Sequence, residues 1–244
     1  MLRHLGKRRY FKHNLGLATF LAFSAGFVNA AGFSAFNVLT TNVTGHAATL
    51  AIDLVNGDWH AAAMVMLWLM LFLTGSFFSG LFIGVVGPEK HAAYRGPVWG
   101  VIFCLGLVMV LAGSGQPTDS HRASAGILLF AMGMQNALVS VISGSVVRTT
   151  HLTGIFTDLG VDLARIVTQG ASTILWLRTW LRLSIIGSFL LGGVSGALVF
   201  HLLGFEAFLV PMAVLLITLA YNRLWIGLKR VKRRVRKVPD IRGR

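Results

Sequence analysis

Charged side chains are nearly missing from residues 14–88 of this chain. Asp53 and Asp58 are the only ones between residues 14 and 88, and charged residues make up only 12% of all 244. Because a soluble domain carries about 25% charged residues, this scarcity excludes a soluble globular domain. Apolar residues make up 55% of the chain, and several apolar runs reach the roughly 20 residues that span a bilayer. The composition predicts a single polytopic membrane domain.

Cysteine and the common cofactor motifs are also lacking. Cys104 is the only cysteine and lies in an apolar run, which excludes an internal disulfide. His46 and His151 stand near polar motifs, but there is no cysteine pair and no His-x-x-x-His pattern, so no metal site is expected. The chain has no P-loop, no dinucleotide fingerprint and no nucleophile elbow. We therefore expect no cofactor, no nucleotide-driven pumping and, as the first interpretation, no enzyme.

The apolar runs predict an all-α protein, because backbone amides cannot be left unpaired in lipid and helices pair them internally. Pro97 is expected at the start of its helix, where its missing N–H costs little. Two shorter segments, 43–56 and 152–168, are either full crossings or broken, re-entrant helices. Six runs are long enough, or nearly so, to cross a bilayer: 16–39, 62–87, 97–115, 124–146, 183–204 and 206–227.

Two sequence motifs occur twice, in the same order. Gly-x-x-Asn-Ala occurs at 26–30 and 133–137, and Thr-Thr-x-φ-Thr-Gly, where φ is apolar, occurs at 40–45 and 149–154. In each copy an aspartate, Asp53 or Asp162, comes eight residues after the final glycine. A duplication with a helix break is typical of transporters. We predict two internal repeats, about 15–115 and 123–227, joined by the polar linker 116–122.

Basic residues are concentrated at the two ends of the chain. Basic tails beside apolar helices usually fix topology and contact anionic lipid headgroups, and nucleic acid is the weaker interpretation. We therefore expect cytoplasmic tails at 1–14 and 228–244, a membrane domain at 15–227 and an even number of crossings.

Charges in the loops favour six crossings with two re-entrant helices over eight crossings. With re-entrant short segments, the 88–96 loop carrying Lys90 and Arg95 is cytoplasmic, as are Arg178 and Arg182, whereas Asp58 lies outside. This arrangement obeys the positive-inside rule better. It gives each repeat three crossings, so the two repeats are expected to be inverted relative to each other. Eight crossings stay the alternative.

The Thr-Gly breaks are the expected binding site. A helix that begins inside the membrane offers free amides and a partial positive charge to a polar ligand, and threonine hydroxyls can cap such a helix. Amides in apolar helices usually bond between helices, but those near the breaks are also candidate solute contacts. The alternative is that these side chains only cap and pack. The candidate solute-binding residues are Asn29, Thr41, Asn42, Thr44, Gly45, Gln135, Asn136, Thr150, His151, Thr153 and Gly154.

Four charged residues in the short segments are candidates for proton or ion coupling: Asp53, Asp158, Asp162 and Arg165. A carboxylate in the membrane costs about 2.5–3.5 kcal/mol on insertion scales, so it is expected to have a role. Asp158, Asp162 and Arg165 share one helix face, so Arg165 is expected to neutralise at least one acid. Asp53 has no basic residue nearby in sequence and is the better proton carrier. The alternative is a structural ion pair.

Two other features have simpler interpretations. The small-residue runs at 75–80 and 192–196 are expected to allow close helix packing. Arg148 precedes the second Thr-Gly break and either binds an anionic substrate or anchors a helix end near the headgroups.

The chain resembles the YoaK family of bacterial membrane proteins. The resemblance rests on 26–45, with its Asn-Ala, Thr-Asn and Thr-Gly elements, and on 130–137 followed by 148–154, and it extends over about 15–225. It implies a multi-pass protein of the inner, cytoplasmic membrane. It brings no accepted substrate and no catalytic residue, so the expected function rests on the physical interpretation.

The leading hypothesis is a secondary transporter or channel for a small polar or anionic solute, with proton coupling as an option. A non-transporting membrane scaffold or sensor is the first alternative, and a membrane-embedded lipid-modifying enzyme is the second. The expected partners are anionic lipid headgroups and an unidentified solute, and a homodimer stays open.

Overall fold

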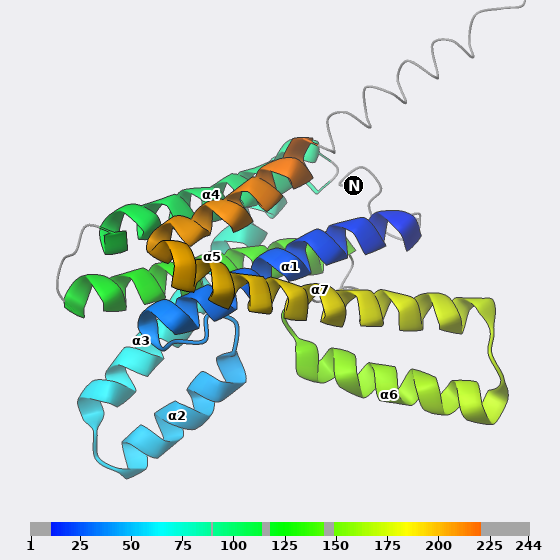
Figure 1. Ribbon diagram of the computed structural model, residues 1–244, viewed down its shortest axis with the longest axis horizontal. Helices are drawn as coiled ribbons and strands as arrows, with labels where there is room; N and C mark the ends of the chain where they lie inside the picture. Colours follow the sequence, from blue (N-terminus) through cyan, green and yellow to red (C-terminus); the bar gives the residue numbers. More distant parts are fainter. Residues whose placement is uncertain (1–10, 89, 114–117, 144–148, 221–244) are drawn as a thin grey trace, which may run out of the picture.

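The structure is a computed structural model that describes residues 11–88, 90–113, 118–143 and 149–220. Every regular element in these ranges is helical (Figure 1). The last helix begins at residue 209 and continues to residue 220, where the described part ends. The preceding elements are α1 (Phe11–Phe36), α2 (Val43–Val55), α3 (Trp59–Val86), α4 (His91–Gly113), α5 (Thr118–Ser143), α6 (Leu152–Gln169), α7 (Thr173–Leu203) and the short 3₁₀ helix η2 (Gly204–Phe208).

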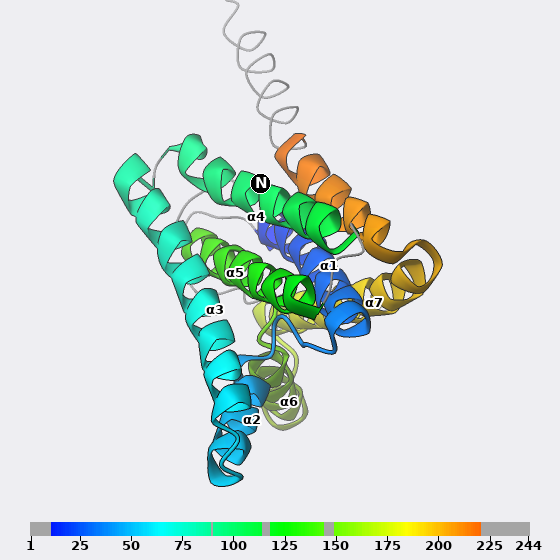
Figure 2. The same ribbon diagram turned by 90° about the vertical axis from the view of Figure 1, so that its left-hand side faces the viewer.

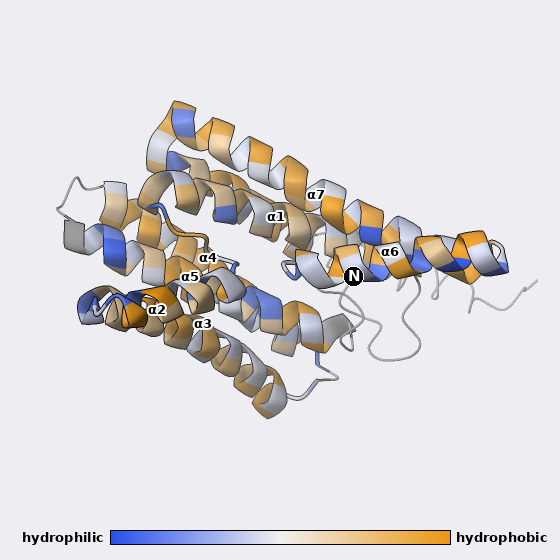
Figure 3. Ribbon diagram, turned by 90° about the horizontal axis from the view of Figure 1, so that it is seen from below, coloured by the Kyte–Doolittle hydropathy of each residue, from blue (hydrophilic) through white to orange (hydrophobic). Residues whose placement is uncertain are grey.

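Five stretches of the described chain are long and apolar enough to cross a membrane: Ala18–Phe36, Trp59–Val86, Ala92–Gly113, Ser120–Val141 and Thr173–Ala220. The last of these contains α7 and the following helix, with η2 between them. Many large apolar side chains on these helices face outward, such as Phe77 and Val85 on α3 and Leu191 and Val194 on α7. Figure 3 shows the apolar colouring along these helices. Such surfaces suit lipid and not water, so the chain has the character of a multi-pass membrane protein.

Five helices begin earlier than the sequence predicted: α1 at Phe11 instead of 16, α3 at Trp59 instead of 62, and also α4, α5 and α7. α4 begins at His91, so Pro97 lies inside the helix and Arg95 does not lie in a loop. α5 begins at Thr118, within the predicted linker, and α7 begins at Thr173 instead of 183. Arg178 and Arg182 therefore lie in α7 and not in a loop. Charged or polar side chains interrupt an apolar run, but they do not end a helix, because its backbone hydrogen bonds do not depend on apolar side chains.

The two short segments agree with the prediction. α2 is a helix of 13 residues and α6 a helix of 18 residues, close to the expected 43–56 and 152–168. Each short helix folds back along the next long helix, α2 along α3 and α6 along α7 (Figures 1 and 2). Gly57, with φ of 74°, makes the tight turn between α2 and α3.

The first helix, α1, packs closely along α7, and the two run in the same direction (Figure 1). A Cβ added to Gly26 would overlap the carbonyl oxygen of Phe189, and one added to Gly192 would overlap that of Phe23. The absence of a side chain at both glycines lets the two backbones touch.

The pair α3 and α5 has the same kind of contact. A Cβ on Gly75 would overlap the carbonyl oxygen of Phe130, and one on Gly133 would overlap that of Phe72. Ser76 adds a hydrogen bond of 3.0 Å from its hydroxyl to the carbonyl oxygen of Gly133. Close packing at the small-residue runs is thus confirmed for Gly75 and Gly192, whereas nothing lies near Gly80. These two tight pairs form the frame that holds the connections between α1 and α2 and between α5 and α6.

Candidate functional site

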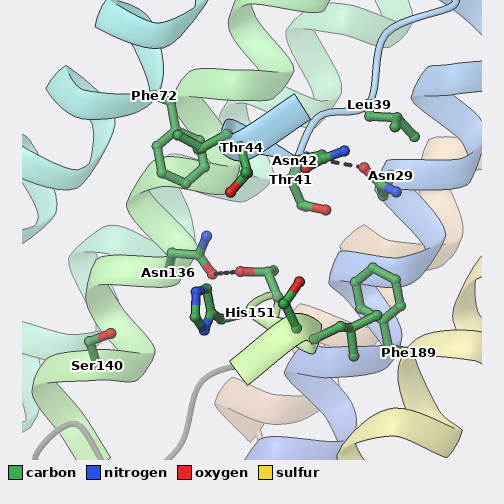
Figure 4. A pocket seen from close by; sticks show the side chains of 14 residues that line it. Asn29, Leu39, Thr41, Asn42, Thr44, Phe72, Asn136, Ser140, His151 and Phe189 are labelled. Carbon is green, nitrogen blue, oxygen red and sulfur yellow. Dashed lines mark hydrogen bonds between the residues drawn. The ribbon is translucent and has the colours of Figure 1, made fainter. Parts of the chain in front are cut away.

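A cavity of about 480 Å³ lies where α2 and α6 begin. Both Thr-Gly breaks contribute to its wall, although they are far apart in the sequence (Figure 4). Helices α1 and α5 add asparagine side chains, and α3 and α7 add phenylalanine rings. The lining residues are Asn29, Leu39, Thr41, Asn42, Val43, Thr44, Phe72, Asn136, Ser140, Thr150, His151, Leu152, Thr153 and Phe189.

An asparagine on the preceding helix holds each break in place. The Oδ1 atom of Asn29 accepts a hydrogen bond of 3.0 Å from the backbone N–H of Thr41. The Oδ1 atom of Asn136 accepts one from the hydroxyl of Thr150 (Figure 4). The duplicated Asn-Ala motif therefore has a local role, which is to tie the end of one helix to the start of the break. In both asparagines the Nδ2 donors stay free of partners among the described residues.

The starts of α2 and α6 are capped differently from the prediction. Asn42, not a threonine, is the N-cap of α2, and its side chain accepts a hydrogen bond of 3.0 Å from the N–H of Gly45. His151 is the N-cap of α6 and makes no side-chain capping bond. Thr44 and Thr153 are each the second residue of their helix, so they cannot cap it. Their side chains are instead part of the cavity wall.

The glycine of each break makes room for the N-cap side chain and does not line the cavity. A Cβ on Gly45 would overlap the carboxamide of Asn42, and one on Gly154 would overlap the ring of His151. Gly45 and Gly154 are predicted solute-binding residues, but neither lines the cavity. Their position beneath the N-cap side chain gives them a steric role.

The N-terminal ends of α2 and α6 both face this cavity, because residues of each first turn line it. The first amides of a helix have no acceptor within the helix. In the described part of the chain, no acceptor pairs with the N–H groups of Val43, Thr44, Leu152 or Thr153. The cavity therefore receives free donors and the positive ends of two helix dipoles.

Gln135, a predicted solute contact, does not line the cavity. Its side chain is buried and donates a hydrogen bond of 2.9 Å from Nε2 to the carbonyl oxygen of Leu21 on α1. The bond joins α5 to α1, which is the usual role of an amide in an apolar helix. Gln135 and Asn136 are neighbours on α5, but helical geometry points them in different directions, and only Asn136 faces the cavity.

None of the four coupling candidates lines the cavity. Asp158 and Asp162 are paired with Arg182 on α7, and the Arg182–Asp158 distance is 3.2 Å. Arg165, the predicted partner of these acids, is exposed and pairs with neither. The prediction failed because it considered only residues on the same helix, whereas α7 presents Arg182 across the hairpin. The side chain of Asp53 is half-buried and has no partner among the described residues.

Two aromatic walls of the cavity were not predicted from the sequence. Phe72 and Phe189 line the cavity from α3 and α7. A signal was present, because Phe-Leu-x-Gly occurs at 72–75 and again at 189–192, where each glycine is one of the close-packing positions. His46 was considered only as a metal ligand. It is buried, its Nε2 lies 2.7 Å from the carbonyl oxygen of Leu39, and it packs edge-on against Trp68.

Some predictions fall outside the described ranges. Arg148 and most of the two basic tails, residues 1–10 and 228–244, belong to this group. Within the described ranges, no three side chains of the metal-ligating types come together.

The fold and the site together define an all-helical protein with several helices long enough to cross a membrane and a polar cavity between two short helices. The chain belongs to the family described as a protein of unknown function, DUF1275, whose model matches residues 17–221. No curated protein and no solved structure matches the chain.

Proposed function

We propose that this protein is a secondary transporter or channel for a small polar or anionic solute. The observation that carries the proposal is the cavity into which both Thr-Gly breaks open. Broken helices whose N-terminal ends meet at a polar cavity are a common way to bind a solute inside a membrane. A scaffold would need neither the cavity nor the free donors around it.

We further propose that the chain consists of two inverted repeats with six crossings. α2 and α6, with 13 and 18 residues, are about 20 and 27 Å long, short of the roughly 30 Å hydrocarbon core. Re-entrant helices fit these lengths better than full crossings. The paired contacts of Gly26 with Phe189 and of Gly133 with Phe72 support equivalent roles for the two halves. On this topology both termini are cytoplasmic, and the solute site lies near the middle of the bilayer.

The resemblance to the YoaK family bears on where the cavity lies and not on what it binds. The residues that carry the resemblance, 26–45, 130–137 and 148–154, supply most of the described cavity wall. We infer that the cavity is the common feature of these proteins and that the chain lies in the inner membrane of a bacterium.

Transport is tested with the full chain in lipid vesicles, using potassium nitrate, potassium formate and urea as probes. Thr44→Val and Thr153→Val keep the side-chain size but remove a hydroxyl from the cavity, and each should reduce flux about tenfold through the lost hydrogen bond. Thr49→Val and Thr157→Val are the matched controls, because these hydroxyls bond to carbonyls of their own helices. If no probe moves through the unaltered protein, the scaffold or sensor function takes the place of this proposal.

The same vesicles test proton coupling. We assign the proton to Asp53, because Asp158 and Asp162 are already paired with Arg182. Asp53→Asn should abolish accumulation driven by a pH gradient and leave equilibrium exchange intact. Asp58→Asn is the control, since asparagine can replace aspartate as the N-cap of α3. Full gradient-driven uptake in Asp53→Asn would leave Asp53 with a structural role only.

A further inference from the structure

We propose that the solute is a small monovalent anion, held between the N-terminal ends of α2 and α6 by hydrogen-bond donors alone. This inference rests on the proposed transport function and narrows its substrate class. The wall of the cavity, as far as the structure describes it, contains no carboxylate. A cation would therefore find no charged ligand there, whereas an anion would find donors on both sides.

The side chains of Asn29 and Asn136 strengthen the preference for an anion over a cation. Asn29 and Asn136 could offer either an acceptor or a donor to a solute. In each of them the Oδ1 acceptor is already used to hold a Thr-Gly break. What remains for a solute is the Nδ2 group, which only donates. Each copy of the motif therefore contributes a donor to the wall.

The starts of the two short helices add to these donors. Thr44 and Thr153 bring free backbone amides and hydroxyl groups to the cavity. The helix dipoles place partial positive charge at both ends. The side chain of His151, which makes no capping bond, is a further ring nitrogen on the wall.

The remaining wall limits the size and the charge of the anion. Phe72 and Phe189 are apolar, and the described residues of the lining include no lysine and no arginine. A divalent anion such as phosphate at high pH would lose much hydration without a full positive charge to replace it. A monovalent anion that dehydrates readily, such as nitrate, or a small carboxylate such as formate, fits these donors better.

A second cavity lies on the other side of the link between α1 and α2. Its volume is about 540 Å³, and residues 33–38 line it together with Trp68, His121, Arg122 and Ala125. Its described lining also has no carboxylate, and it contains Arg122. Because Val38 borders this cavity and Leu39 borders the first one, we infer that the second cavity is an approach to the first.

The test measures the fluxes of nitrate, formate, phosphate, urea and potassium through the full chain in lipid vesicles. Nitrate or formate should move at least about tenfold faster than the other probes. Comparing the nitrate flux with the formate flux shows whether the protein prefers an inorganic ion or a carboxylate. Faster flux of potassium or urea would overturn the inference while leaving transport in place. If none of the probes crosses the membrane, the transport proposal fails. Anion binding is then tested by the melting temperature of the detergent-solubilised protein, which nitrate should raise.

Asn29→Asp and Asn136→Asp are the diagnostic variants. Each keeps the Oδ1 acceptor that holds its break and replaces only the free donor with a carboxylate oxygen, so the local structure should persist. We expect nitrate flux or nitrate-induced stabilisation to fall at least about tenfold. This fall corresponds to the loss of one hydrogen bond to a charged group. Asn56→Asp, at the exposed end of α2, changes the net charge equally and should have no effect. Unchanged anion flux in both cavity variants, with normal melting temperatures, would overturn the inference.

Discussion

Asp162 and Arg182 lie on different helices of one hairpin and form an ion pair inside it. The side chain of Asp162 is only 3% exposed, whereas that of Asp158, which also pairs with Arg182, is 63% exposed. A buried charge that loses its partner is far more costly than an exposed one. The two acids therefore have unequal importance, although they bind the same arginine.

We predict that Asp162→Asn lowers the free energy of unfolding by about 3 kcal/mol, because it leaves the guanidinium of Arg182 without its buried partner. Asp158→Asn, the matched variant on the same helix, should cost no more than about 1 kcal/mol. Both values can be measured by denaturant titration in detergent, followed by tryptophan fluorescence. Equal losses in the two variants would mean that burial does not distinguish these pairs.

At the scale of elements, α1–α7 and α3–α5 are pairs in which glycine lets two helix backbones touch. Residues Gly75 and Gly192 fill the same role in α3 and α7, each against a carbonyl oxygen of the partner helix. Other glycines of the same helices, Gly80 and Gly187, have nothing within 4 Å of an added Cβ. The contact, and not the residue type, therefore decides what a substitution does.

We predict that Gly75→Ala and Gly192→Ala each destabilise the protein by about 1–3 kcal/mol or more, because the added methyl group forces the paired helices apart. Gly80→Ala and Gly187→Ala should be neutral or stabilising by up to about 1 kcal/mol, since alanine is the better helix former. Melting temperatures of the four variants in one detergent provide the comparison. A loss of stability in the control variants as large as in the contact variants would argue against backbone contact.

For the whole molecule, the proposed six-crossing arrangement would place the α2–α3 turn outside the cell and the start of α4 inside. Asn56 and Ala92 are exposed positions at these two places. On a Cys104→Ala background, a membrane-impermeant thiol reagent added to intact cells should label Asn56→Cys and spare Ala92→Cys. Permeabilised cells should label both, which controls for reactivity. Labelling of Ala92→Cys in intact cells would favour eight crossings.

Composition and local patterns were enough to predict the class of protein and the short helices. Low charge and long apolar runs predict helices in lipid, since unpaired amides are not tolerated there. The duplicated Thr-Gly breaks mark the starts of α2 and α6 to the residue. These features depend on neighbours in the sequence, so they are visible without a fold.

Only the tertiary structure decided which of the candidate residues meet. Thr44 and Thr153 line one cavity, but Gln135 bonds to α1 and Arg182 replaces Arg165 as the partner of the acids. In each case the outcome depends on the direction of a side chain and on a helix that is distant in the sequence. The periodicity of one segment does not show where a side chain points in the fold or which distant helix it meets. Both depend on how the helices are placed, and the packing of glycine against a distant carbonyl oxygen sets that placement.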